Sequence, residues 1–157
     1  SRTVADMLPE TVAELAAHPN IVGLKDATGD IGRLKATQKL VSDDFLLLSG
    51  DDLTGCEFLA NGGHGVISVT ANIVPKLMAD MCNASLSKDF QLAAKIDKQI
   101  VDLHRALFIE PNPVLPKWAL HKMGLTNSAF LRLPLVESEL ASQNHIEQVM
   151  RSSGVLS

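Results

Sequence analysis

Hydrophobic and polar positions in the first half of the chain predict strands that alternate with helices. Three short runs are apolar almost throughout, at residues 21–25, 45–48 and 65–69. Runs of this length and composition are typical of strands that are buried on both faces. Segments with helical spacing lie around them, at residues 8–18, from an N-cap at Asp30 onward, and at residues 53–60. The pattern therefore predicts parallel strands whose sheet is covered on both faces.

The second half of the chain has a different pattern, in which helical spacing predominates. We predict helices over residues 73–85, 89–108 and 113–123, and a weaker one over 137–151. The long helix carries one apolar stripe, formed by Leu92, Ile96, Ile100, Leu103 and Leu107. No convincing strand follows Val69, so the layout is three β/α units followed by a helical tail.

This layout fits either a small α/β sheet or the last part of a (β/α)8 barrel, which typically needs ~250 residues. The chain has 157 residues and begins without an initiator methionine, which suggests a processed chain or a piece of a longer one. In the barrel interpretation, residues 1–86 form a partial (β/α)8 barrel with its last three strands and their helices. Residues 87–157 then form a C-terminal helical domain.

Composition narrows the functional class. A net charge of -4 without a basic cluster argues against a nucleic-acid partner. No apolar run approaches the ~20 residues that cross a bilayer, so no membrane partner is expected. Cys56 and Cys82 lie in predicted helices without CxxC spacing, which is typical of reduced thiols in a cytoplasmic protein.

Lys25 is the main candidate for chemistry, because it stands at the end of an apolar strand. Partial burial there would lower the lysine pKa and favour the neutral amine. A neutral amine can form a Schiff base with a carbonyl compound, and parallel α/β folds place their chemistry at this end of the strands. The alternative is a lysine whose ammonium extends into solvent and pairs with Asp26 or Asp30.

Two loops could line the same site. In the run SGDD, residues 49–52, Gly50 could allow a close approach to a ligand. The alternative for that loop is a helix cap made by Asp51 or Asp52. In the run NGGHGVISV, residues 61–69, the glycine spacing fits no nucleotide motif. We expect His64 there to be exposed and structural, and Ile67 and Ser68 to line a pocket on the same edge as Lys25.

Arg2 is a further candidate, because its guanidinium can bind a carboxylate through two hydrogen bonds. On its own, an arginine this close to a terminus is more often solvated. The five histidines show neither HxH nor HExxH spacing, and they form no metal motif with the cysteines.

Several motifs together resemble the dihydrodipicolinate synthase family: SRT, GLKDATGD, LLSGDD, GGHGVISVTAN and EPNPVLPKWAL. The resemblance covers essentially the whole chain and matches the C-terminal half of that family. It implies strands six to eight of a (β/α)8 barrel and a lyase of lysine biosynthesis. This lyase condenses pyruvate with aspartate semialdehyde through a lysine Schiff base. It also implies a cytoplasmic homotetramer without a metal or organic cofactor.

Carried onto this chain, the resemblance implies a role for four residues. Lys25 is the Schiff-base lysine, and Arg2 binds the carboxylate of aspartate semialdehyde. Gly50 and Ile67 line the pyruvate pocket.

The resemblance also implies that part of the family's site is absent. A Gly-Thr-Thr-Gly motif and proton-shuttling tyrosines belong to the other half of the family, and this chain contains no tyrosine. We therefore expect little synthase activity from the chain alone. Two alternatives remain open: another class I pyruvate aldolase, such as a relative of N-acetylneuraminate lyase, or a catalytically silent half-barrel that forms oligomers.

Overall fold

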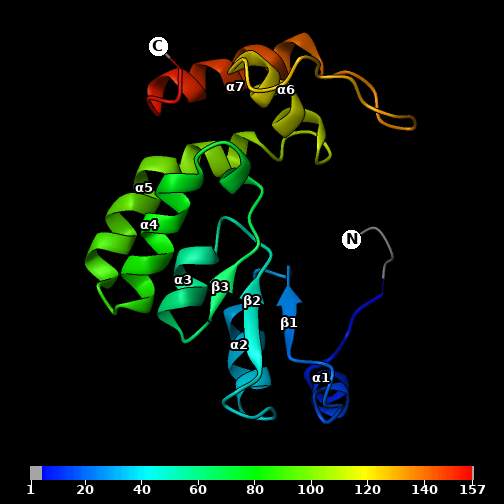
Figure 1. Cartoon of the computed structure of the whole chain (residues 1–157), viewed down its shortest axis with the longest axis vertical. Helices are drawn as coiled ribbons and strands as arrows, with labels where there is room; N and C mark the ends of the chain where they lie inside the picture. The colour runs from blue at the N-terminus through cyan, green and yellow to red at the C-terminus, as the bar shows by residue number, and fades with distance from the viewer. Residues whose placement is uncertain (1–4, 157) are drawn as a thin grey trace. The chain divides into compact units, whose positions relative to one another are not determined.

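The computed structural model describes residues 5–156 (Figure 1). The chain divides into two compact units, residues 1–67 and residues 68–157. Arg2 lies outside the described residues. The domain limits expected from the sequence, 1–86 and 87–157, differ from this division into packing units, and they stay a prediction.

The first unit alternates helices and strands along its whole length. Its elements are α1 (Pro9–Ala16), β1 (Gly23–Asp26), α2 (Ile31–Gln38), β2 (Leu46–Ser49), α3 (Gly55–Ala60) and β3 (Gly65–Val66). The strands form one parallel sheet in the order β1-β2-β3 (Figure 1). The predicted parallel pairing is therefore confirmed.

One face of this sheet carries the core of the unit. The buried cluster draws on the three helices and the middle strand, and it consists of Val12, Leu34, Phe45, Leu47 and Phe58. The opposite face is open, because Leu46, beside the buried Leu47, is 43% exposed. Val22, just before β1, is 67% exposed. The prediction that both faces are covered is wrong for the described residues, because their helices pack on one face only.

The element boundaries follow local chemistry. The carboxylate of Asp30 accepts a hydrogen bond from the Arg33 amide at 3.2 Å, so the predicted N-cap of α2 is confirmed. β3 is shorter than predicted and ends at Val66. The Ile67 amide still donates to the Ser49 carbonyl at 2.7 Å, after which the chain turns into a 3₁₀ turn, η1 (Thr70–Asn72).

The second unit is helical. Its α-helices are α4 (Pro75–Leu86), α5 (Phe90–Ala106), α6 (Val114–Lys122) and α7 (Leu140–Ser152). Residues 68–156 contain no strand, as the sequence predicted. The main apolar cluster draws on η1, α5, α6 and α7 and consists of Ile73, Leu103, Ala106, Leu107, Leu115, Ala119, Ile146 and Met150. The predicted stripe of α5 is buried from Ile96 onward, whereas Leu92, in its first turn, is 45% exposed.

Two further expectations can be checked in the described residues. Among the described residues, no disulfide joins Cys56 to Cys82, and burial raises the pKa of the Cys82 thiol. Among the described helices, none combines the length and apolar character that crossing a membrane requires.

A polar group lies inside the helical unit. The Thr70 hydroxyl and His104 Nδ1 are 2.7 Å apart, and both residues are fully buried. Asp97 Oδ1 lies 3.6 Å from His104 Nε2. A carboxylate on that side favours the tautomer with its proton on Nε2, so that Nδ1 accepts from Thr70. The hydroxyl therefore joins η1 to α5 in a region from which water is excluded.

We expect Thr70→Val to destabilise the chain by about 1–3 kcal/mol, because a buried ring nitrogen loses its hydrogen bond. Denaturant unfolding measures the change. Thr11→Val, on the exposed side of α1, is the control and should change little. Equal stability of the two variants would contradict the prediction.

The carboxylate of Glu147 joins α6 to α7. It lies 2.8 Å from Lys122 Nζ and 2.9 Å from Arg151 Nη2. Hydrogen bonds from Lys122 and Arg151 lower the pKa of Glu147 below its ordinary value of 4.5.

Because the folded-state pKa is lowered, this contribution to stability is present above the ordinary pKa and is lost as pH falls through the folded value. Glu147→Gln should therefore lower the melting temperature at neutral pH, and the difference should vanish in strong acid. Thermal unfolding across pH measures this, with Glu14→Gln in α1 as the control. A difference that does not change with pH would contradict it.

Candidate active site

The C-terminal ends of the three strands bring three predicted site residues onto one edge of the sheet. Lys25 in β1 lies opposite Leu48 in β2. The amide of Gly50 donates to the Asp26 carbonyl at 2.7 Å, and the amide of Ile67 donates to the Ser49 carbonyl at 2.7 Å. Lys25, Gly50 and Ile67 therefore follow one another across adjacent strand ends.

Gly50 gives the Lys25 side chain its space. A Cβ atom built on Gly50 would lie 2.5 Å from Lys25 Cε, 3.3 Å from Lys25 Cγ and 3.0 Å from Ala27 Cβ. Carbon atoms that are not bonded do not approach this closely. The aliphatic part of the Lys25 side chain therefore lies across Gly50. As long as that side chain keeps its present conformation, position 50 must be a glycine.

Lys25 is exposed in the described chain, so the predicted partial burial of its side chain is wrong here. The cause is the open face of the sheet described above. The simple alternative, a surface ion pair, is not observed either. Asp26 instead lies 3.4 Å from Arg33 Nε and accepts from the Thr28 amide at 2.8 Å. Asp30 caps α2, and no ion pair joins Lys25 to an acidic group within the described residues.

The loop after β2 is fixed by its own side chains. Asp51 Oδ2 accepts from the Thr54 amide at 3.0 Å and from the Thr54 hydroxyl at 2.7 Å. The Ser49 hydroxyl donates to the Asp51 carbonyl at 3.1 Å. Asp51 therefore holds the turn that precedes α3. The predicted helix cap by Asp51 or Asp52 is wrong, because α3 begins at Gly55 rather than near residue 53, and its N-cap is Thr54 without a side-chain cap hydrogen bond.

The loop around β3 behaves largely as expected. His64 is exposed, and its Nδ1 accepts from the Leu47 amide at 3.0 Å, which is a structural contact. The side chain of Ile67 is 47% exposed, while its amide is held by the sheet. Ile67 thus offers apolar surface at the edge that carries Lys25.

Sequence reasoning missed one residue beside this edge, Arg33. Its guanidinium contacts both Asp26 and Asp6. The ion pair lowers the pKa of Asp6 and raises the pKa of Arg33. Asp6 and Arg33 are 27 positions apart, and no spacing rule connects residues at that separation.

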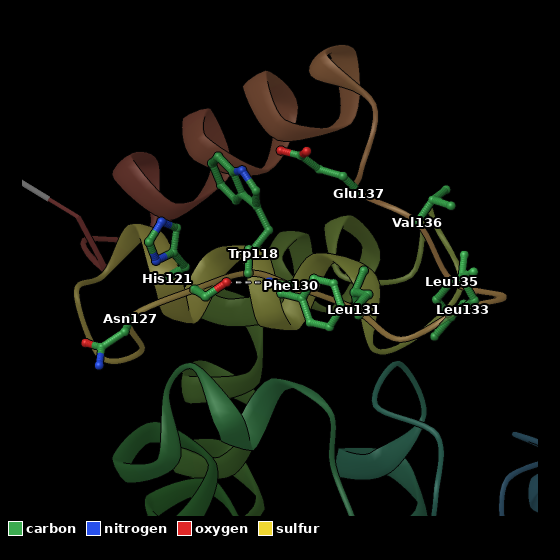
Figure 2. A pocket seen from close by; sticks show the side chains of 11 residues that line it. Trp118, His121, Asn127, Phe130, Leu131, Leu133, Leu135, Val136 and Glu137 are labelled. Atoms are coloured by element: carbon green, nitrogen blue, oxygen red, sulfur yellow. Dashed lines mark hydrogen bonds between the residues drawn. The ribbon is translucent and has the colours of Figure 1, made fainter.

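A pocket of about 860 Å³ lies in the helical unit, and the sequence did not predict it. Trp118 and His121 of α6 line it together with residues of the segment from Asn127 to Glu137 (Figure 2). Most of the lining from that segment is apolar, and Lys25, Gly50 and Ile67 are not part of it. Among the described residues, no group of three or more His, Cys, Asp or Glu side chains could hold a metal ion.

Comparison with known proteins identifies the fold and the family. The model of the dihydrodipicolinate synthetase family matches residues 1–153. The 4-hydroxy-tetrahydrodipicolinate synthase of Pseudoalteromonas atlantica is 76% identical over 99% of this chain and 53% of the relative. That of Psychromonas ingrahamii is 58% identical over 86% of this chain and 46% of the relative.

Comparison with solved structures gives the same family. The dihydrodipicolinate synthase of Acinetobacter baumannii, complexed with pyruvate, is 41% identical with a TM-score of 0.92. The match covers 96% of this chain and 52% of that one. A monomeric dihydrodipicolinate synthase variant has a TM-score of 0.93 at 36% identity, over 99% of this chain and 53% of that one.

The match to solved dihydrodipicolinate synthases identifies the three parallel β/α units as part of a (β/α)8 barrel, as expected. The chain belongs to the dihydrodipicolinate synthetase family. It spans about half the length of the curated relatives that it matches.

We expect Gly50→Ala to displace the Lys25 side chain, because the new methyl group would overlap Lys25 Cε. The strand pairing should survive, and a crystal structure of the variant would show both effects. Gly32→Ala is the control, because its Cβ would meet only an Asp30 oxygen at 3.1 Å. An unmoved lysine in Gly50→Ala would contradict the prediction.

Proposed function

We propose that this chain supplies the Schiff-base half of a lyase of lysine biosynthesis, which joins pyruvate to aspartate semialdehyde and gives 4-hydroxy-tetrahydrodipicolinate. The observation that carries the proposal is the position of the Lys25 side chain, which lies across Gly50 at the C-terminal edge of the sheet. The chain's membership of this family supports it. This edge is where parallel α/β folds place their catalytic groups. The pyruvate complex of the Acinetobacter baumannii relative agrees with pyruvate as the first substrate.

The chemistry begins with the neutral amine of Lys25, which attacks the ketone carbon of pyruvate. Loss of water gives an iminium ion, and the nitrogen then draws electrons from the neighbouring methyl group. Removal of one methyl proton gives an enamine. Its carbon forms a bond to the aldehyde carbon of the second substrate, which restores the iminium ion. The amino group of that substrate then attacks the iminium carbon, which closes the ring and releases Lys25 as the free amine. Because the iminium nitrogen is itself the electron sink, the reaction needs no metal and no organic cofactor.

The other candidate residues have supporting roles in this proposal. Gly50 leaves room for the lysine and its bound keto acid. Ile67 provides apolar surface beside them, and its amide is already held by Ser49. Arg2 binds the carboxylate of aspartate semialdehyde through its planar fork.

The proposal also requires groups that this chain does not contain. It has no tyrosine to act as general acid, and the open sheet face leaves Lys25 exposed. Covering that face would desolvate the amine and favour its neutral form. We propose that the remaining half of a full-length protein does this, and that the complete enzyme is a cytoplasmic homotetramer.

The test uses a hybrid chain, in which the N-terminal portion of the Pseudoalteromonas atlantica relative precedes residues 1–157. Borohydride reduction with pyruvate should add one reduced pyruvate to the peptide that contains Lys25, as mass spectrometry would show. Lys25→Arg should abolish both the adduct and synthase activity. Lys35→Arg, on the exposed side of α2, should keep both.

The separate 157-residue chain should show little synthase activity, because it lacks the general acid and the clamp for the pyruvate carboxylate. An active hybrid that forms no adduct on Lys25, or whose Lys25→Arg variant stays active, would refute the proposal.

A further inference from the structure

The hydroxyl group of Ser49 lies at the end of the middle strand, and the chemistry proposed above does not use it. Ser49 is the last residue of β2, where it pairs with Asp26 in β1 and with Val66 in β3. The residue is only 1% exposed. Because a buried hydroxyl without hydrogen-bond partners is costly, its partners indicate why a polar side chain occupies this position.

Ser49 Oγ is hydrogen-bonded to both backbone groups of one residue, Asp51. It accepts from the Asp51 amide at 3.2 Å and donates to the Asp51 carbonyl at 3.1 Å. One hydroxyl can do both, because it carries one hydrogen and two lone pairs. Serine side chains often form turns of this kind with the residue two positions further on. Gly50, which lies between Ser49 and Asp51, is therefore enclosed in a small ring of hydrogen bonds.

Gly50 is also fixed from the neighbouring strand. Its amide donates to the Asp26 carbonyl at 2.7 Å. The Lys25 side chain packs directly on the glycine, because a Cβ atom built on Gly50 would lie 2.5 Å from Lys25 Cε. Cε is the carbon that carries the amine. Even a small displacement of Gly50 toward the lysine would therefore move the amine.

The side chain of Asp51 extends this fixed turn toward α3. Its Oδ2 accepts from the Thr54 amide at 3.0 Å and from the Thr54 hydroxyl at 2.7 Å. The carboxylate also lies close to the loop after β1, because a Cβ atom built on Gly29 would meet Asp51 Oδ2 at 3.3 Å. Asp51 is therefore held by its backbone through Ser49 and by its side chain through Thr54.

We propose that Ser49 is a positioning residue for the Schiff-base lysine. Its hydroxyl fixes the turn at Gly50, and Gly50 supports the Lys25 side chain in the orientation from which the amine meets pyruvate. Ser49 acts through Gly50, because its own side chain is buried in the sheet. Small displacements of a reacting group slow a reaction strongly, so this support affects the capture of pyruvate. The inference rests on the function proposed above.

The test uses the hybrid chain and compares capture of pyruvate with use of the second substrate. Ser49→Ala removes the hydroxyl but keeps the backbone carbonyl that accepts from the Ile67 amide. It should raise the pyruvate concentration that gives half-maximal borohydride-trapped adduct about tenfold. At saturating pyruvate, the KM for aspartate semialdehyde should change little, because the substitution acts on the lysine alone.

Ser85→Ala is the matched control. Ser85 in α4 is also a buried serine, 4% exposed, and its hydroxyl has no hydrogen-bond partner among the described residues. This variant should leave the half-maximal pyruvate concentration unchanged. If Ser49→Ala lowers the melting temperature but leaves that concentration unchanged, Ser49 is merely structural and the inference fails.

Thr54 provides a second test, which decides if Ser49→Ala does not fold. Thr54→Val keeps the shape of the side chain but removes the hydroxyl that donates to Asp51. It should raise the half-maximal pyruvate concentration about threefold, because the Asp51 turn is then held less firmly. Thr54→Ser keeps the hydroxyl and should match the unsubstituted hybrid. Valine and serine variants that behave alike would overturn the inference.

Failure of the underlying function has a different signature. In that case the unsubstituted hybrid forms no adduct on Lys25, and the inference fails with the proposed function. An unsubstituted hybrid that forms the adduct, together with a Ser49→Ala variant that captures pyruvate equally well, overturns only the inference.

Discussion

The candidate site depends on the backbone ladder that aligns β1, β2 and β3. Parallel pairing fixes which residues reach the same edge, and the hydrogen bonds from Gly50 to Asp26 and from Ile67 to Ser49 continue the alignment beyond the strands. A shift of one residue would turn Lys25 to the opposite face of the sheet. The helices on the covered face resist such a shift, because Leu47 is packed among Val12, Leu34 and Phe58.

Around this ladder, short polar contacts define the loops. Asp30 begins α2, Asp51 holds the turn before α3, and Arg33 joins the end of β1 to the N-terminal segment. Each contact satisfies backbone or charged groups that would otherwise face solvent at the strand ends. The loop geometry near Lys25 is therefore set by neighbouring side chains as well as by the sheet, even though Lys25 itself is exposed.

Much of this arrangement could be predicted from the sequence. The three apolar runs specified parallel strands, because β/α alternation needs a helical crossover between neighbours. Lys25, Gly50 and Ile67 could be grouped because each lies at a strand end. The burial of Leu46 and Lys25 could not be predicted. Whether these side chains are covered depends on which other parts of a protein pack against them, and the local sequence pattern does not contain that information. The Asp6–Arg33 ion pair could not be predicted from the sequence either, because only folding brings these two distant positions together.

The uncovered side of the sheet has a consequence for how the chain would behave in solution. Within the described residues, β1 has a neighbouring strand on one side only, and apolar side chains such as Leu46 face outward next to it. Such an edge offers free amide and carbonyl groups to any extended peptide. Without a covering half, aggregation through this edge would increase with protein concentration, and a net charge of -4 would offer only weak protection against it.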